Sequence, residues 1–210
     1  MNFNKIADVR KLFFINSFFF ATIVSIGQQS SLSVEKIECR NQYHGSKLVL
    51  TCTSNGVTKK SSVYSYDMET FINLDDSCKL ILIGKLLQYD SDTSSCCINV
   101  TNWSFNGIEG CRGKPKNVNH YTIQVDALFM INRLCWPKLM ELYSCSQVLY
   151  DNELKKDINS DQEKIKIVFD GYKKWYNACK IKGKIDRYFP FNDGRYVWYG
   201  GRKSIAPKNE

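Results

Sequence analysis

Cysteine is the residue type whose number and spacing say most about the chemistry open to this chain. Nine cysteines occur among 210 residues. No CxxC pair is present, and neither histidine stands at a metal-ligand spacing, so the pattern does not favour structural zinc. In an oxidising compartment it predicts a disulfide framework instead. The disulfide candidates are Cys39, Cys52, Cys78, Cys96, Cys97, Cys111, Cys135, Cys145 and Cys179.

The cysteines also follow a repeated order. Cys39-x12-Cys52-x25-Cys78 is succeeded by Cys97-x13-Cys111-x23-Cys135. This predicts a repeated unit, a strand pair followed by a helix that ends on a cysteine, and at least three intramolecular bridges that tie Cys78 and Cys135 to neighbouring hairpins. Because nine is odd, one thiol is expected to be free or to pair between chains, and the vicinal pair Cys96-Cys97 is where the pairing is most ambiguous.

The two histidines, His44 and His120, are the residues from which an acid/base pair could be built. Isolated histidines more often lie at the surface or in turns, and we favour that interpretation. No Gly-x-Ser-x-Gly, P-loop or His-Glu-x-x-His motif is present. The sequence therefore gives hydrolases and nucleotide enzymes no positive support, and it predicts no cofactor.

Basic and aromatic residues alternate near the carboxyl end of the chain. Residues 28–110 carry a net charge of −2 and residues 111–210 one of +8, and 171–210 alone hold ten basic and three acidic residues. This mixture suits a polyanion, because cations hold phosphates and aromatic faces stack on bases. The alternative is a lysine-rich solvent face whose aromatics lie in the core. The RNA-binding candidates are Lys182, Lys184, Arg187, Tyr188, Arg195, Tyr196, Tyr199, Arg202 and Lys203.

Among the aromatics of this segment, Tyr196 and Tyr199 are expected to be exposed. Phe189, Phe191, Val197 and Trp198 are expected in the core.

The same segment resembles the central strands of small fungal guanyl-preferring ribonucleases. Phe189-Pro190-Phe191, a short turn and the run VWYGG at 197–201 carry the resemblance, and Tyr121-Thr122 to Cys135 is similar to the helix of that family. Ile37-Glu38-Cys39 is similar to the aromatic-x-Cys signature of secreted powdery-mildew effectors, with isoleucine in place of the aromatic residue. The resemblance implies a ribonuclease-like C-terminal lobe and a secreted effector whose partner is host RNA or a host protein.

The catalytic residues of that family are not carried over. Its base, a glutamate before Phe-Pro, falls on Tyr188, and its arginine after Gly-Gly falls on Pro207. Cleavage of RNA by its 2′-hydroxyl needs a base, an acid and a cation for the developing charge. The resemblance therefore implies a catalytically inactive, ribonuclease-like effector that acts by binding. The alternatives are a divergent active secreted ribonuclease and a disulfide-stapled extracellular ligand or surface module.

Local patterns indicate an α+β fold in which a helix packs on an antiparallel sheet, framed by disulfides. The expected helices are Asp67–Cys78, Gln124–Leu134 and a stretch that includes Phe169, Tyr172, Tyr176 and Cys179. The expected strands are Ser46–Thr53, Lys79–Leu87, Ile98–Phe105, Ile165–Phe169 and a hairpin within Tyr188–Tyr199. The polar stretch Asp151–Gln162 is expected to be a surface loop.

The amino-terminal segment 1–27 has a basic start, an apolar centre and small residues at its end, which is the pattern of a cleaved signal peptide. We therefore expect a secreted, extracellular protein, open to delivery into host cells, with no stable membrane association after cleavage. Two adjacent sequons make Asn99 and Asn102 glycosylation candidates. The mature chain is expected to form a cysteine-rich lobe, 28–110, and a basic lobe, 111–210. The sequence does not predict the oligomeric state.

Overall fold

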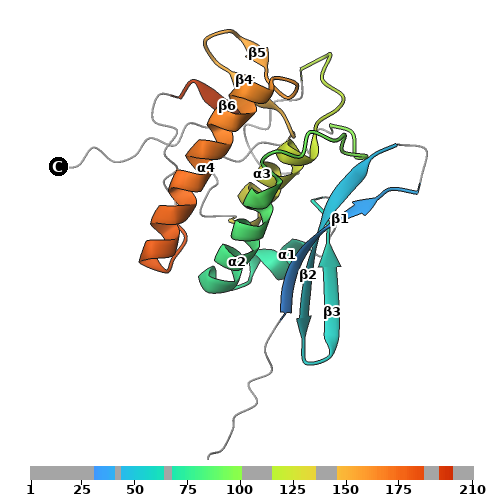
Figure 1. Ribbon diagram of the computed structural model, residues 1–210, viewed down its shortest axis with the longest axis vertical. Coiled ribbons are helices and arrows are strands. Elements are labelled where there is room, and N and C mark those ends of the chain that lie inside the picture. Colours follow the sequence, from blue (N-terminus) through green and yellow to red (C-terminus); the bar gives the residue numbers. More distant parts are fainter. Residues whose placement is uncertain are drawn as a thin grey trace, which may run out of the picture.

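The computed structural model describes residues 31–40, 44–63, 68–100, 115–135, 146–186 and 194–200. Within them the chain is mixed α+β, which confirms the expected class. Figure 1 shows α3 between α4 and the first sheet, and the second sheet near the start of α4. The elements in chain order are β1 (Ser31–Glu38), β2 (Ser46–Ser54), β3 (Val57–Ser61), α1 (Met68–Ile72), α2 (Asp76–Leu86), the 3-10 helix η1 (Leu87–Tyr89), α3 (Ile123–Leu134), β4 (Leu149–Asp151), β5 (Lys156–Asp157), α4 (Gln162–Lys182) and β6 (Tyr196–Trp198).

The first sheet is antiparallel, with β2 between β1 and β3. The predicted strand Ser46–Thr53 is confirmed as β2, and its alternation places Leu48 and Leu50 fully inside the core. Asn55 and Gly56 join β2 to β3 with φ angles of 53° and 76°. Such a pair is the strongest short-range hairpin signal, because both central residues need a positive φ. The Asn55-Gly56 pair thus marks the β2–β3 hairpin in the sequence.

The expected helix and strand between Asp67 and Leu87 are both wrong in part. The helix is divided, and the apolar run after it forms α2 rather than a strand. Asp75 starts α2 by accepting a hydrogen bond from the Cys78 amide at 2.8 Å. Cys78 therefore lies in the first turn of a helix and not at a helix end. The run is apolar on several sides because α2 packs against β1, α3 and α4, and such a helix cannot be told from a buried strand by its periodicity.

Helix α3 confirms the prediction for Gln124–Leu134 and is the most central element. Each of its twelve residues is buried. The helix ends at Leu134, so Cys135 does follow a helix end, as the repeated unit predicts. Pro137, expected to end this helix, lies outside the described residues.

Helix α4 replaces the strand expected at Ile165–Phe169. Asp161 begins the helix by accepting from the Lys164 amide at 3.2 Å, and Gly183 ends it with a φ of 64°. Ile165, Val168 and Phe169 are buried at helical spacing, which continues to the residues already expected in a helix. The short apolar run is thus the first buried turn of one long helix. Cys179 lies inside α4, in its last two turns.

The second sheet corrects the expected loop at Asp151–Gln162. Strand β4 pairs antiparallel with β5 on one side and with β6 on the other, and Asp151 is fully buried. Strand β6 confirms the second half of the expected hairpin, while the first half lies outside the described residues. The described part of 111–210 therefore has three short strands, and the ribonuclease-like lobe is not confirmed.

One hydrophobic cluster contains residues from both expected lobes, including Leu48 of β2, Leu82 of α2, Phe129 of α3 and Trp198 of β6. The division at 110 falls in a part of the chain that is not described, so the two lobes stay a prediction. Ile98–Val100 form no strand, and the remainder of the expected strand there is not described. Asn99 is half-buried; Asn102 and the leader also lie outside the described ranges.

Candidate nucleic-acid interface

The structure places five of the nine RNA-binding candidates, in two separate groups. Lys182 and Lys184 lie at the carboxyl end of α4, whereas Arg195, Tyr196 and Tyr199 lie in and beside β6. The other four are outside the described residues: Arg187, Tyr188, Arg202 and Lys203.

The two groups are far apart. Asp151 lies within ion-pair distance of both Arg195 and Lys164, so Arg195 is next to the first turn of α4. A helix rises about 1.5 Å per residue, which separates Lys164 from Lys182 by about 27 Å along the axis. The described candidates therefore do not form the single patch that their closeness in sequence predicts.

Arg195 is already engaged by carboxylates. Its Nε lies 3.1 Å from Glu153 Oε2 and 3.5 Å from Asp151 Oδ2, and its guanidinium stands 5.2 Å from the centre of the Tyr196 ring. Two nearby carboxylates offset its charge, which makes Arg195 a poor phosphate ligand in this arrangement.

The aromatic candidates differ from expectation. Tyr196 is only 6% exposed, so its predicted exposure is wrong: the alternation of β6 turns Tyr196 and Trp198 inward. Tyr199 is half-buried and meets Tyr150 edge to face, with 5.4 Å between ring centres. Tyr150 was missed by sequence reasoning because strand β4 is too short to show an alternation.

The large aromatic side chains of α4 belong to the core. Tyr172 is fully buried, accepts a hydrogen bond from Trp198 Nε1 at 2.8 Å and donates one to Asn132 Oδ1 at 2.6 Å. Burial raises the pKa of Tyr172. Trp175, also buried, donates to the Asp186 carbonyl at 3.0 Å. The core position expected for Trp198 is confirmed, and these aromatics offer no stacking surface.

The exposed side of α4 carries a row of lysines that we call the α4 basic face. Its members are exposed, and none has a carboxylate within ion-pair distance among the described residues: Lys166, Lys174, Lys180 and, just after the helix, Lys184. At about 100° per residue, the three helical lysines fall within an arc of about 120°. Two exposed carboxylates, Glu163 and Asp170, share this side. Lys184 is the one member that was also a sequence candidate.

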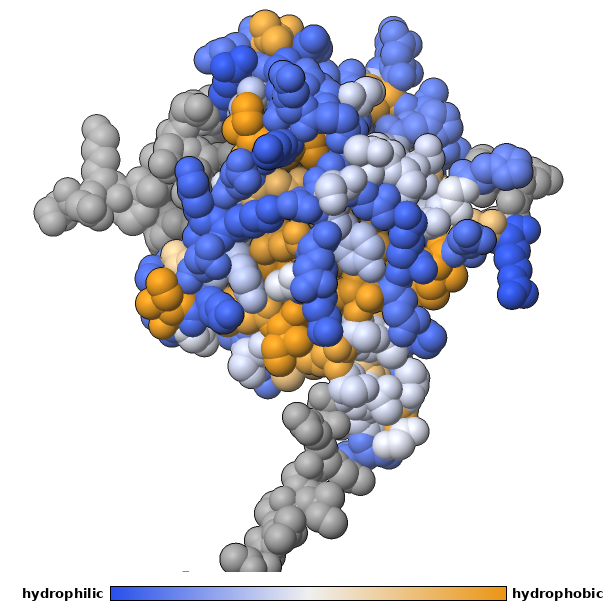
Figure 2. All heavy atoms as spheres, viewed as in Figure 1, coloured by the Kyte–Doolittle hydropathy of each residue, from blue (hydrophilic) through white to orange (hydrophobic). Residues whose placement is uncertain are grey.

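The remaining lysines of α4 are bound within the molecule. Lys164 pairs with Asp161 at 3.1 Å, Lys182 pairs with Asp186 at 2.6 Å, and Lys173 pairs with Asp90. On the side of the molecule seen in Figure 2, hydrophilic side chains lie over much of the surface with smaller apolar areas between them. The α4 basic face is thus a part of the described surface where four cations remain available.

The histidines show no catalytic arrangement. His44 and His120 are both exposed. Both lie close to the segment Ser95–Cys97, because Ser46 N, two residues after His44, donates to Ser95 O, and the carbonyl of Tyr121, the residue after His120, accepts from Cys96 N. No hydrogen bond from a described side chain orients either imidazole.

The cysteines give one bridge among the described residues, Cys39–Cys97. Cys52 and Cys78 are half-buried free thiols, and Cys96, Cys135 and Cys179 are buried ones. Cys111 and Cys145 lie outside the described ranges. The disulfide framework is therefore confirmed for one pair, and the number of bridges stays a prediction.

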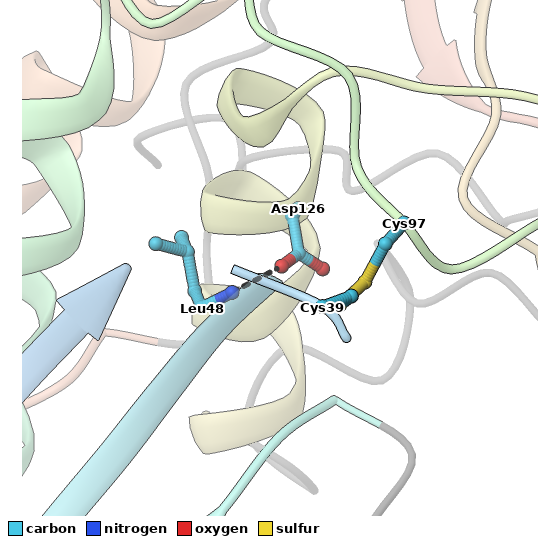
Figure 3. The surroundings of a disulfide bond; sticks show 4 residues. All are labelled: Cys39, Leu48, Cys97 and Asp126. Carbon is cyan, nitrogen blue, oxygen red and sulfur yellow. Dashed lines mark hydrogen bonds between the residues drawn. A yellow bond between two sulfur atoms is a disulfide. The ribbon is translucent and has the colours of Figure 1, made fainter. Parts of the chain in front are cut away.

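A buried carboxylate lies beside this disulfide. Figure 3 shows Asp126 reaching from α3 toward the start of β2, where its Oδ2 accepts from the Leu48 amide at 3.1 Å. Burial raises the pKa of Asp126 to about 7. The Leu48 hydrogen bond, the charge of Lys47 and the hydroxyl of Tyr121 lower this pKa but do not outweigh burial. Burial, with a contribution from Asp126, also raises the pKa of Cys96 to about 12. Asp126 is enclosed in the core, so it is not placed to meet a ligand.

No protein-family model, curated protein or solved structure matches the chain. None of the helices within the described ranges combines the length and the apolar character that crossing a bilayer requires. The described side chains also contain no cluster of three or more histidine, cysteine or acidic residues suited to a metal ion.

Proposed function

We propose that this protein is a secreted, non-catalytic binding protein that holds single-stranded RNA along the α4 basic face. The observation that carries the proposal is the row of exposed lysines without described carboxylate partners: Lys166, Lys174, Lys180 and Lys184. Lysines at helical spacing follow a phosphate backbone as point charges and need no base-specific geometry. Binding of this kind is independent of base sequence.

Secretion is part of the same proposal. The leader pattern at 1–27 supports it, and so does the Cys39–Cys97 disulfide, because such bonds persist mainly in oxidising compartments. The resemblance to secreted mildew effectors favours host RNA as the ligand.

The non-catalytic part of the proposal rests on the residues that proton transfer would need. Tyr188 and Pro207 stand where the resemblance implies a glutamate and an arginine. The exposed histidines lack an orienting hydrogen bond from a described side chain. A positioned acid or base contributes typically 10²–10⁴-fold to such a reaction.

Salt-dependent RNA binding tests the proposal. Fluorescence anisotropy with a labelled single-stranded RNA of mixed sequence would give the affinity between about 50 and 200 mM salt. Each phosphate contact contributes about 0.7 to the slope of log K against log salt for single strands. Changing Lys166, Lys174, Lys180 and Lys184 to Ala should therefore reduce the slope by about 3 and weaken binding most at low salt.

A matched control removes four exposed lysines elsewhere, by changing Lys59, Lys60, Lys116 and Lys156 to Ala. Both variants lose the same net charge, but the control lysines lie outside the α4 basic face, so the control should keep most of the slope. Equal losses in the two variants would contradict a defined face. Binding that ignores salt would leave an acidic protein surface as the better ligand, and turnover of the RNA by the wild-type protein would overturn the non-catalytic part.

A further inference from the structure

The inner face of the first sheet ends in a cysteine. Side chains two residues apart on a strand point the same way, so Cys52 follows Leu48 and Leu50 on the face of β2 that meets the helices. Cys52 packs against the core cluster but is only half-buried. Its partner across the sheet, Leu32 of β1, also packs against that cluster.

Helix α2 brings a second cysteine to the same end of this face. Cys78 is in the first turn of α2, and α2 packs against β1. The hydrogen bond between Lys36 and Asp92, 2.6 Å long, shows how α2 is oriented along β1. Asp92 follows η1, which continues α2 at its carboxyl end, and Lys36 lies further along β1 than Leu32. The first turn of α2 therefore lies toward Leu32, whose neighbour on β2 is Cys52.

The lengths of the two elements agree with this alignment. Leu32 to Lys36 covers about 13 Å of strand at 3.3 Å per residue. Cys78 to Tyr89 covers about 16 Å of helix. Strand and helix thus run side by side over a similar length, with a cysteine near the same end of each.

The local electrostatics place the two thiols near each other. Burial raises the pKa of Cys78, and Asp75 and Cys52 raise it further. Such an effect of Cys52 on Cys78 requires the two side chains to lie close together, which agrees with the alignment of β1 and α2.

We propose that Cys52 and Cys78 form a disulfide in the oxidised protein, a covalent link between β2 and the first turn of α2. The oxidant is a low-molecular-weight disulfide such as oxidised glutathione. One cysteine, as thiolate, attacks it and releases one glutathione thiolate; the second then attacks the protein sulfur of the mixed disulfide and releases the other. The protein loses two electrons and two protons, and both released thiolates end as glutathione thiols.

The other free thiols in the described part of the chain are less suited to this exchange. Cys96, Cys135 and Cys179 are buried, which hinders attack by an external disulfide. Cys96 is in addition held protonated, because burial raises its pKa to about 12. Cys52 and Cys78 are the two that are half-buried, and β1 lies beside both of their elements.

Peptide mapping of the full chain tests the proposal directly. The protein is equilibrated with oxidised and reduced glutathione, alkylated and digested without reduction, and the linked peptides are identified by mass spectrometry. A peptide pair joined through Cys52 and Cys78 is expected. Alkylation of both residues, or linkage of either one to Cys111 or Cys145, would overturn the proposal.

Variants separate the bond from the packing of the side chains. Cys52→Ser, Cys78→Ser and the double variant should each lower the melting temperature by the same amount, about 5–15 °C, because each removes one bond. Strong reductant should abolish most of the difference from wild type. Cys179→Ser is the control, since its effect should persist in reductant. Additive losses in the double variant, or losses unchanged by reductant, would contradict the bond.

Discussion

A fully buried aspartate lies at each of the two sheets, and the pKa values of the two aspartates are shifted in opposite directions. Asp126 of α3 reaches the first sheet, and Asp151 belongs to β4 of the second sheet. The pKa of Asp126 is raised to about 7, whereas that of Asp151 is held below its usual range. Both side chains are buried, so burial alone does not explain the difference between their pKa values.

Asp151 accepts hydrogen bonds from more backbone amides than Asp126 does. Burial raises the pKa of Asp151. The amides of Leu154 and Glu153, each 3.0 Å from its Oδ1, and the charges of Arg195 and Lys164 together lower this pKa by more than burial raises it. Asp126 accepts from the Leu48 amide, and burial outweighs the groups that favour its charged form. Burial opposes ionisation at both sites, and the number of donors and cations decides the outcome.

The largest expected effect concerns Asp126. Between about pH 4 and 7 the folded protein keeps a proton on Asp126 that the unfolded chain has lost, so the free energy of unfolding falls as the pH rises. A shift from 3.8 to about 7 amounts to about 4 kcal/mol over this range. Asp126→Asn keeps an acceptor for Leu48 and is neutral throughout, so it should remove this fall. Urea unfolding at several pH values measures it.

Asp170→Asn is the control for this prediction, because Asp170 is exposed on α4. It should leave the pH dependence of wild type almost unchanged. The quantity to compare is the difference between each variant and wild type, since other carboxylates contribute equally to both. A constant difference between Asp126→Asn and wild type from pH 4 to 7 would contradict a raised pKa.

The next effect concerns Asp151. Asp151→Ala leaves two backbone amides without their acceptor and should cost about 3 kcal/mol at neutral pH. Asp151→Asn should cost less, because its amide oxygen can still accept. The stabilisation from a lowered pKa is present above the unfolded value of 3.8 and is lost as the pH falls through the folded value. Acid should therefore narrow the gap between wild type and Asp151→Asn, and a gap that widens in acid would reverse the comparison.

The smallest effect sharpens the comparison through the neighbouring cations. Lys47→Ala should raise the pKa of Asp126, and Arg195→Ala should raise that of Asp151, because each change removes a charge that favours the carboxylate. Carbon-detected NMR titration of the aspartate carboxyl groups measures both. A fall in either pKa would show that the cation acts through packing instead.

Sequence patterns located elements best where one period was sustained. The twelve-residue helix α3 and the long strand β2 were predicted closely. Short apolar runs were assigned wrongly: those at Lys79–Leu87 and Ile165–Phe169 belong to the helices α2 and α4. Both begin just after a capping aspartate, Asp75 or Asp161. The caps were visible in the sequence, but the β-branched and apolar composition outweighed them.

The sequence predicted that the candidate interface is basic, but it did not predict which residues form it. The excess of lysines is a property of the sequence, and so is the helical spacing of Lys166, Lys174 and Lys180. Which lysines find carboxylates depends on residues distant in the chain, as when Lys173 meets Asp90. For the same reason Arg195 appeared available in the sequence and is engaged by Glu153 and Asp151 in the fold.

The sequence by itself determined the α+β class, the basic character of the carboxyl-terminal half and the presence of cysteines that can bridge, because composition and local periodicity carry these properties. Only the tertiary structure decided that Tyr196 is buried, that the pKa values of Asp126 and Asp151 shift in opposite directions, and that α2, which holds Cys78, packs against the strand paired with Cys52. Each of these depends on which groups from distant segments surround a side chain. Solvation and charge at a buried site are set by those neighbours, and no local window of sequence contains them.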